Sequence, residues 1–539
     1  MARTNIIDRA IAAVAPGAAL RRAAARRGLE LMNSGYGNYG ANTTKKSMRG
    51  WLYGGGSAKE DIEDNLDILR QRSRDAYMGV PTAAAALKTL RTNVIASGLV
   101  PAPKLDADFL GLGPEAASEL QAKIIREFSL WADTSACDAD GFDNFYQLQQ
   151  LAFLSVLMNG DAFALLQERE RPGAPYALQV RLIEADRVCS PDGYDRLSPC
   201  EVRGHQVERI VQGVETDWEG AVKAYWIRST HPLSAQAWQG GGYEEQWQRV
   251  LARDPETGRR NLLHIMTRER AGQVRGVPLL APVLETLKEL GRYTEAEVTA
   301  AVISSYTTVF VKEAEQGDGL PFGQLLPPEE RIEPGSLNTL ELGPGIISAL
   351  GPGEDLTTVD PKHPNTEYST FTDALIRQIG AAVEVPQEVL QKHFSTSYSA
   401  ARGALNEFWR VCGMWREWFA DDFCRPIYEQ WFAEAAARRR IPAAGFFSDP
   451  ARRKAYTETT WNGPARTSLN PLQEVQAAAL RVEMGFSTAQ EETAQMSGGD
   501  YDINIRQRLV EAVGKRAVDE IAHPQETTAP VPEREEENT

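Results

Sequence analysis

The sequence predicts an α+β protein built from two or more modules, and three observations support this prediction. The chain has 539 residues, more than the roughly 250 to 300 at which a single hydrophobic core stops growing. Apolar residues make up 42% of the chain and charged residues 24%, which is typical of globular proteins. Segments with helical spacing of apolar residues alternate with short segments of strand composition. These features exclude disorder over the whole chain and a fibrous repeat.

Residues 1–60 are predicted to form an irregular, basic N-terminal arm, because glycines interrupt the segment repeatedly. The first 50 residues hold nine Lys or Arg but only Asp8 and Glu30, a local charge of +7, whereas the whole chain carries −16. Such an arm suits an anionic partner, and a solvated, frayed terminus is the alternative. The acidic body argues against tight binding of a DNA duplex, because phosphate neutralisation supplies most of that affinity.

Residues 61–275 are predicted to form an α+β module. Helical periodicity predicts helices near 62–77, 82–96, 115–132 and 142–159. Strand composition bounded by turn residues predicts strands at 162–166, 176–183, 207–211 and 222–226.

A helix, a β-rich insertion and a second helix are predicted to follow. An apolar stripe that includes Leu284 and Leu287 predicts a helix over 276–306. Residues 307–363 contain a strand-like segment at 309–311 and many Pro and Gly residues, so they are predicted to form a small β-rich insertion. Helical spacing resumes over 364–385 and breaks before Pro386.

The C-terminal part is predicted to be helical apart from its end. Residues 386–398 are predicted to form a loop, and 399–464 a long aromatic helix with a connection, which Pro426 kinks or divides. Two helical patterns, at 467–496 and 500–522, fill the segment 465–522. The proline- and glutamate-rich segment 523–539 is predicted to be a disordered acidic tail.

No catalytic residue, cofactor or metal site is predicted. The chain has no phosphate-binding P-loop, no HExxH motif and no GxSxG motif, and its six histidines show no ligand spacing. Asp421 and Asp422 point about 100° apart on a helix, so a solvated face is favoured over a metal site. The five cysteines form no CxxC pair, which favours reduced thiols. Neither a membrane span nor a secretory signal is predicted.

Several motifs, taken in order, resemble the lambda-like portal family of tailed phages. They are RSRD at 72–75, NVIASGL at 93–99, MNGDAF at 158–163, LIEADRV at 182–188, GVETD at 213–217, HP at 231–232, RGVPLL at 275–280, GAAVEVP at 380–386 and TSYSAAR at 396–402. Each motif alone has an ordinary interpretation as a helix end or a turn, whereas the ordered series does not.

The resemblance implies a portal-type subunit. It has an α+β wing (61–275), long stem helices (276–306 and 364–385) that flank a small β-rich clip (307–363), a tunnel loop (386–398), and a helical C-terminal crown (465–522). It also implies a ring of twelve copies at one capsid vertex, through which double-stranded DNA passes without sequence specificity during packaging and ejection. The implied partners are the terminase large subunit, head-completion or connector proteins, and the major capsid and scaffold proteins. The implied location is the virion, after assembly in the host bacterial cytoplasm.

The resemblance also assigns regions of contact. The residues expected to face DNA in the tunnel loop are Gln387, Lys392, His393, Ser395, Thr396, Ser397 and Tyr398. Those expected to dock terminase and connector proteins on the clip are Glu329, Glu330, Arg331 and Glu333. Leu284, Leu287, Trp409 and Trp415 are expected to pack between subunits, and a purely intrachain core is an equal alternative for them.

Two other classes of protein stay open at this point. A soluble α/β enzyme with an unrecognised site would show a pocket with convergent titratable groups. A head-tail adaptor is another phage structural protein, but adaptors are usually much shorter. The gateway interpretation, in which the chain is not an enzyme, requires the helices on either side of 307–363 to pair.

Overall fold

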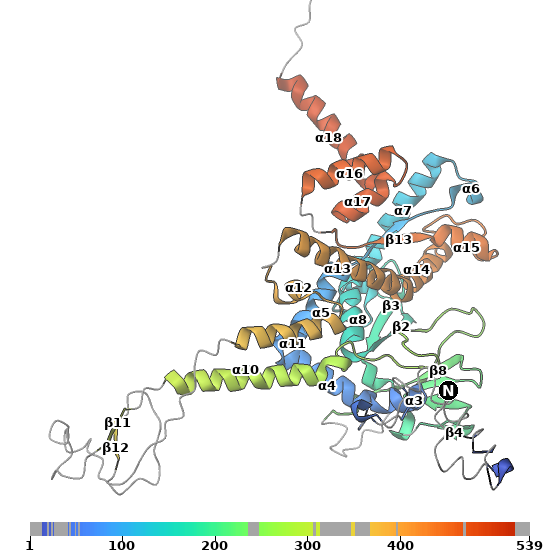
Figure 1. Ribbon diagram of the computed structural model, residues 1–539. Helices are drawn as coiled ribbons and strands as arrows, with labels where there is room; N and C mark the ends of the chain where they lie inside the picture. The colour runs from blue at the N-terminus through green and yellow to red at the C-terminus, as the bar shows by residue number, and fades with distance from the viewer. Residues whose placement is uncertain are drawn as a thin grey trace, which may run out of the picture. The chain divides into compact units, whose positions relative to one another are not determined.

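The structure of the protein is a computed structural model that describes residues 54–193, 195–234, 247–305, 309–312, 347–350, 367–394, 397–466 and 470–522, with scattered positions before residue 54. The chain divides into two compact units, Met1–Ser57 and Ala58–Thr539. The second unit contains the sheets and the hydrophobic core, and Figure 1 labels its elements. The predicted acidic tail and most of the predicted basic arm lie outside the described residues.

Four helices from the first part of the second unit contribute to its core. They are α4 (Leu66–Gly79), α5 (Pro81–Val94), α7 (Pro114–Ala132) and α8 (Phe145–Asn159). The predicted helices are confirmed, with ends that shift by up to four residues. Shorter helical segments are α3 (Ala58–Asp61), α6 (Ala107–Leu110) and the 3-10 turns η3 (Glu63–Asn65), η4 (Ser135–Cys137), η5 (Ala185–Arg187), η6 (Pro191–Gly193) and η7 (Ala281–Val283).

Local chemistry sets the ends of these helices. Pro81 lies in the first turn of α5, where the missing N–H has no helical partner to lose. The side chain of Asn144 accepts a hydrogen bond from the backbone N–H of Gln147, and the side chain of Gln147 accepts one from the backbone N–H of Asn144, which forms a capping box at the start of α8. Gly160 ends α8 with a φ of +90°, a conformation that glycine adopts without steric cost.

Antiparallel sheets follow α8 in the chain. A three-stranded sheet has the order β10-β2-β3, and a four-stranded sheet has the order β6-β7-β8-β9. Their strands are β2 (Asp161–Glu168), β3 (Leu178–Ile183), β6 (Arg209–Val211), β7 (Val214–Thr216), β8 (Val222–Arg228), β9 (Trp247–Leu251) and β10 (Leu262–Met266). Two smaller pairs are β4 (Cys200–Val202) with β5 (His205–Val207), and β1 (Val100–Pro103) with β13 (Thr459–Asn462). The predicted α+β class is confirmed.

The sequence prediction missed several of these strands. β1 contains Pro101 and Pro103, which cannot donate ladder hydrogen bonds, and it pairs with a single strand, β13, where prolines are tolerated. β7 has only three residues, too few to display an alternating pattern. The strand predicted at 207–211 is divided between β5 and β6.

A single large aromatic cluster joins the N-terminal helices to the C-terminal ones. Phe128 of α7 lies 4.9 Å from Trp431 and 5.7 Å from Phe145, measured between ring centroids. Both contacts are edge-on, the geometry that the ring quadrupole favours. Phe423 stacks on Phe145 at 6.0 Å. The core therefore depends on contacts between residues 278 and 303 positions apart in the sequence.

The predicted long aromatic helix is present but divided. α13 (Tyr398–Phe419) continues through a π-helical turn, η9 (Ala420–Cys424), into α14 (Arg425–Ala437). Pro426 lies in the first turn of α14. Because proline offers no N–H to the preceding turn and crowds it, the turn widens there. The prediction that Pro426 interrupts this helix is confirmed.

The aspartates of the π-helical turn differ from each other. Asp421 is exposed and forms an ion pair with Arg425 at 2.8 Å, as predicted for a solvated face. Asp422 is half-buried, and burial raises its pKa. The prediction of a shared solvated face is therefore wrong for Asp422.

The last described part of the chain is helical. α15 (Pro450–Thr457) precedes α16 (Pro471–Glu483), α17 (Ala489–Ser497) and α18 (Tyr501–Ala522). The helical pattern predicted over 467–496 is divided between α16 and α17, because Gly485 adopts a φ of +75° and a capping box between Thr488 and Glu491 starts a new helix. Among the described residues, no helix combines the length and apolar content needed to cross a membrane.

Candidate functional site

The predicted β-rich insertion is flanked in the chain by two long helices, and these helices lie side by side in space. α10 (Leu284–Ser305) precedes the insertion and α11 (Tyr368–Ala382) follows it, and the two helices contact each other (Figure 1). The helices predicted within 276–306 and 364–385 are present, over the shorter ranges 284–305 and 368–382. Residues 276–283 form the approach to α10 rather than its first turns, because Pro278 and Pro282 interrupt the backbone hydrogen bonds there.

Aromatic side chains hold the two helices together. Tyr293 of α10 stacks on Tyr368 of α11 with 5.6 Å between ring centroids. Tyr293 also meets Phe371 edge-on at 5.1 Å, and the Tyr368 hydroxyl donates to Oγ1 of Thr294 at 3.4 Å. Each aromatic pair of this kind stabilises by about 0.5–1.5 kcal/mol beyond its area burial. The pairing on which the gateway interpretation depends is therefore present.

A short pair of parallel strands lies between these helices in the chain. β11 (Val309–Lys312) pairs with β12 (Ile347–Leu350), with Val309 opposite Ile347. The strand predicted at 309–311 is confirmed. The four residues predicted to dock other proteins, Glu329, Glu330, Arg331 and Glu333, lie outside the described residues.

The helical pair is buried at one end and exposed at the other. Leu287 and Leu290, near the start of α10, belong to the main core together with Ile379 of α11. Val298 and Val302, near the end of α10, are 58% and 47% exposed. The core therefore anchors the start of α10, while its outer half lies in solvent.

The predicted subunit-packing residues fall into two groups. Leu287 is fully buried inside the chain's own core, as the intrachain alternative predicts. Leu284, Trp409 and Trp415 pack against the same core and keep part of their surface exposed. Contacts of these three side chains with a neighbouring subunit stay a prediction.

A tight turn ends α11. Gly380 lies against the backbone of Val385, whose N–H donates to the Gly380 carbonyl at 2.9 Å. A Cβ atom at Gly380 would lie 2.5 Å from the Val385 carbonyl oxygen, too close for any other residue. Val383 and Val385 are both buried. This explains why the GAAVEVP motif combines a glycine with alternating valines.

The segment after this turn is only partly a loop. Residues Gln387–Gln391 form the short helix α12, whose Leu390 is buried, so the prediction of a loop over all of 386–398 is wrong for its first part. Lys392 ends α12 with a φ of +55°, and the N–H of His393 donates to the Glu388 carbonyl at 3.0 Å. α12 thereby fixes the backbone from which Lys392 and His393 extend.

The exposed residues that follow α12 are polar or cationic. Lys392, His393 and Ser397 are exposed, and Tyr398 is 55% exposed. Ser397 caps α13 by accepting the N–H of Ala400 at 3.4 Å. Side chains of these types contact phosphate oxygens without reading a base sequence. Gln387 of the predicted set is half-buried and bonds to Gln391, and Ser395 and Thr396 lie outside the described residues.

A buried ion network lies where the chain approaches α10. The carboxylate of Asp161 is fully buried and accepts Nε of Arg275 at 2.6 Å and Nη2 of Arg70 at 3.4 Å. Nε2 of His264 lies 3.3 Å away from the same carboxylate. The other donors of Arg275 reach three backbone carbonyls, those of Ala185, Val188 and Gln212, at 2.6–2.8 Å. A buried charge stabilises the fold only when its partners are complete, and this arrangement supplies them.

Burial and the neighbouring charges shift the pKa values of the groups in this network. Burial alone would favour the neutral acid, but the charges of Arg275 and Arg70 outweigh it and hold the pKa of Asp161 well below its usual range. Burial lowers the pKa of Arg70 to about 10, and the neighbouring charge of Arg275 adds to this shift. Burial also lowers the pKa of His264. At neutral pH the network therefore contains two arginine cations, one carboxylate anion and a neutral imidazole.

Two glycines allow the network to close. A Cβ atom on Gly276 would lie 1.9 Å from the carbonyl oxygen of Gly160. A Cβ atom on Gly160 would lie 2.5 Å from the carbonyl of Gly276. The backbone at the end of α8 thus touches the backbone that leads into α10. This approach is possible only with glycine at both positions, because any side chain there would clash with the opposite backbone.

This network was not predicted from the sequence, although two of its members, Asp161 and Arg275, lie in the motifs. Asp161 belongs to MNGDAF and Arg275 to RGVPLL, while Ala185 and Val188 of LIEADRV supply acceptor carbonyls. The sequence feature that could have indicated a buried ion pair is a carboxylate, Asp161, directly before the apolar residues of β2. Three of the motifs, MNGDAF, LIEADRV and RGVPLL, thus meet at one place in the fold.

Next to the network, three possible metal ligands approach one another. Glu184, Asp186 and His231 each offer a ligand atom within 4.8 Å of the others. Arg74 already donates to Glu184 at 3.0 Å and to Asp186 at 2.8 Å. Nδ1 of His231 accepts the N–H of Leu233 at 3.1 Å, and its Nε2 lies 3.9 Å from the carboxylates of Glu184 and Asp186. The arrangement is an ion-pair cluster rather than a set of ligands ready for a metal.

Comparison with known proteins relates the chain to phage proteins. A family model described as phage portal protein, lambda family, matches residues 44–416. Portal protein B of Escherichia phage lambda is 23% identical over 487 residues, which cover 87% of this chain and 88% of that protein. The portal protein of Escherichia phage N15 is 23% identical over 490 residues, with the same two coverages. The probable portal protein of Halomonas phage phiHAP-1 is 26% identical over 339 residues, 61% of this chain and 58% of that protein.

Two of the solved structures that are similar to the chain come from gene transfer agent particles. A chain from the neck of the native particle has a TM-score of 0.40 and 13% identity, and the match covers 80% of this chain and 92% of that one. A chain from the virion of the native particle has a TM-score of 0.36 and 15% identity with the same two coverages.

Proposed function

The chain belongs to the lambda family of phage portal proteins, and from that premise we propose that its copies form a ring at one capsid vertex, through which double-stranded DNA is packaged and later ejected. The proposed ring has twelve copies. As a portal protein the chain is a component of the virion, and assembly in the host bacterial cytoplasm is part of the proposal. A gateway acts by shape and charge, so we assign the chain no catalytic residue and no cofactor.

The observation that carries the proposal is the pairing of α10 with α11 around the chain segment that contains β11 and β12. Tyr293 and Tyr368 hold the two helices together, and the main core holds their inner ends. A helical pair fixed at one end can project from each subunit and line a common channel. Identical copies close into a ring when each presents two different, complementary faces.

The charge of the chain fits passage of DNA with weak contacts. The net charge is −16, so a channel lined by identical acidic subunits repels the phosphate backbone and limits sticking at the wall. The exposed Lys392 and His393 after α12 supply salt-sensitive phosphate contacts. The segment proposed to face DNA consists of Gln387, Lys392, His393, Ser395, Thr396, Ser397 and Tyr398.

The partners of the ring are proposed by region. Glu329, Glu330, Arg331 and Glu333, in the segment between β11 and β12, are proposed to dock the terminase large subunit and then the head-completion or connector proteins. The major capsid and scaffold proteins are proposed to contact other parts of the ring. The partly exposed Leu284, Trp409 and Trp415 are proposed to pack against a neighbouring copy.

Negative-stain imaging of the purified full-length protein tests the proposal. The expected result is a ring with a central hole wide enough for a DNA duplex, about 20 Å across. A uniformly monomeric protein that turns over a small molecule would support the enzyme alternative instead. Closed particles without a hole would also contradict the proposal, because DNA could not pass through them.

A further inference from the structure

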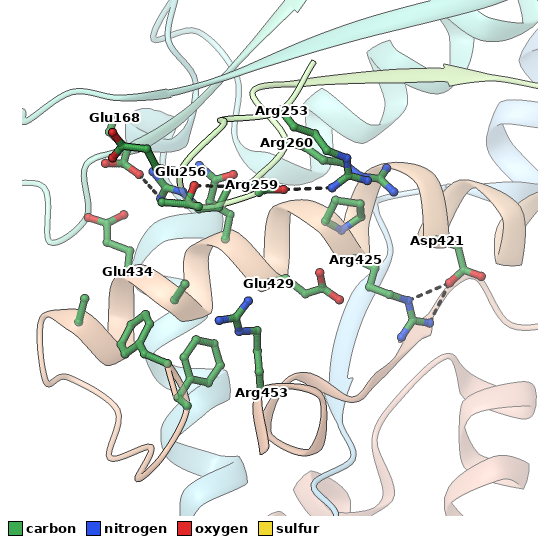
Figure 2. A pocket seen from close by; sticks show the side chains of 18 residues that line it. Glu168, Arg253, Glu256, Arg259, Arg260, Asp421, Arg425, Glu429, Glu434 and Arg453 are labelled. Carbon is green, nitrogen blue, oxygen red and sulfur yellow. Dashed lines mark hydrogen bonds and ion pairs between the residues drawn. The ribbon is translucent and has the colours of Figure 1, made fainter. Parts of the chain in front are cut away.

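A cleft of about 810 Å³ lies between the turn that joins β9 to β10 and the helices α14 and α15 (Figure 2). Arg253 and Arg260 come from the turn, Arg425 and Glu429 from α14, and Arg453 from α15. A concave site of this volume accommodates a small ligand. The cleft involves neither the α10–α11 pair nor the segment after α12.

Two of the arginines lie directly opposite each other. Arg253 and Arg260 form an antiparallel bridge across the turn, so their side chains lie on the same face. Figure 2 shows their guanidinium groups next to each other. Like charges placed opposite each other in this way destabilise the local structure. Arg253 donates to the Gly258 carbonyl at 3.1 Å, which offers no compensating charge.

The arginines of the cleft differ in whether a carboxylate pairs with them. Arg259 forms an ion pair with Glu168 at 2.5 Å, and Arg425 forms one with Asp421 at 2.8 Å. Within the described part of the chain, no carboxylate lies at ion-pair distance from Arg253, Arg260 or Arg453. The unpaired positive charge is therefore concentrated on these three side chains.

Arg453 approaches the cleft from the opposite side. Its guanidinium lies 5.7 Å from the ring centroid of Phe446, and Figure 2 shows it pointing toward Glu429. Glu429 is the carboxylate that Arg260, Arg425 and Arg453 all approach, and burial raises its pKa in spite of them. Over the whole lining, five arginines are matched by five acidic side chains. At this end, among the described residues, Arg253, Arg260 and Arg453 have only Glu429 and Asp422, which also approaches Arg260, so one positive charge remains in surplus.

We propose that the cleft binds a phosphate group, held by Arg253 and Arg260 from one side and by Arg453 from the other. Guanidinium groups match the geometry of phosphate oxygens and donate two hydrogen bonds each to them. A bound phosphate also removes the repulsion between Arg253 and Arg260. The phosphate belongs to a DNA backbone or to a free polyphosphate, two sources with the same chemistry. The proposal goes beyond the gateway function and does not depend on ring formation.

Isothermal titration with inorganic pyrophosphate at low salt tests the proposal on the full-length protein. The wild type is expected to bind, and the double variant R253Q/R260Q is expected to lose about tenfold or more in affinity. R259Q is the matched control: it lies on the same turn but is already paired with Glu168, so its affinity is expected to change by less than about threefold. Without ligand, the double variant should melt no earlier than the wild type, because a repulsive pair has been removed.

Titration with a short DNA duplex separates the two sources of phosphate. If the duplex binds and the double variant weakens it as strongly as it weakens pyrophosphate, the ligand is a DNA backbone. If only pyrophosphate depends on the two arginines, the ligand is a free polyphosphate. Absence of pyrophosphate binding, an equal loss in R259Q, or a lower melting temperature of the ligand-free double variant would each overturn the proposal.

Discussion

Basic side chains are buried and paired where the chain approaches α10, whereas they are exposed in the segment after α12. Around Asp161, two arginines and a histidine are buried and nearly every donor has an acceptor. After α12, Lys392 and His393 are exposed and extend from a helix that is itself anchored by Leu390.

The difference shows how location decides what a charge does. A buried charge that loses its partner costs the fold several kcal/mol, so the network locks the chain where α10 begins. An exposed charge contributes little to stability and stays available for a passing phosphate. Substitutions in the first region should therefore change stability, and substitutions in the second should change the interaction with DNA.

Removing the central carboxylate is expected to have the largest effect. Asp161→Asn leaves Arg70 and Arg275 buried without their anion, which should lower the free energy of unfolding by about 3–5 kcal/mol. Denaturant unfolding followed by tryptophan fluorescence measures it. Asp140→Asn is the control, because Asp140 and its partner Arg181 are 52% and 40% exposed, and its cost should be below about 1 kcal/mol. Equal effects of the two substitutions would refute the distinction between buried and exposed charge.

Adding a methyl group at the glycine contact should have the next largest effect. Gly276→Ala places a Cβ atom against the Gly160 carbonyl, and the backbone must shift, at a cost of about 1–3 kcal/mol. Gly291→Ala in α10 is the control, since nothing lies within 4 Å of the added atom. It should stabilise the helix by about 0.5–1 kcal/mol. Thermal unfolding of both variants tests the predicted opposite signs.

Acidification should weaken the same network through His264. Its pKa is lowered by burial, so the unfolded chain binds a proton more readily, and the contribution is fully present above the unfolded pKa of about 6.5 and declines as the pH falls below it. The free energy of unfolding should fall by up to about 1.4 kcal/mol per pH unit from this group. His264→Gln should show a smaller slope between about pH 6.5 and 5. An unchanged slope would mean that His264 does not titrate on unfolding.

The smallest effect on stability is expected in the exposed segment. Lys392→Glu should change the free energy of unfolding by less than about 0.5 kcal/mol and leave ring assembly intact. It should nevertheless alter DNA packaging or DNA retention, because the phosphate contact becomes a repulsion. A packaging assay in phage particles that carry the variant measures this. Loss of the ring would instead show that the segment is structural.

The sequence predicted the helices and the α+β class well because their signals are local. The pairing of α10 with α11 was expected from the order of elements, and the prolines and glycines between them marked the insertion. Prediction failed where short segments depend on contacts from elsewhere, as for β1 and β13, whose pairing joins Pro101 to Trp461. It also failed at α12, whose formation depends on the burial of Leu390.

The sites could be predicted only in part for a related reason. Exposed Lys392 and His393 stand out in a sequence, but the partners of Asp161 come from positions 70, 264 and 275. No spacing rule connects residues so far apart. The cross-strand pair of Arg253 and Arg260 likewise becomes visible only when the turn between β9 and β10 is in place.

Site-specific photocrosslinking in DNA-filled particles tests whether the segment after α12 lines the DNA channel. A photoreactive residue at position 392 should crosslink to DNA, because this segment is proposed to lie on the wall of the channel. The same residue at the exposed position of Lys123 on α7 serves as the reference and should crosslink much less. Equal yields at the two positions, or no DNA crosslink from position 392, would contradict the proposed position of this segment in the channel.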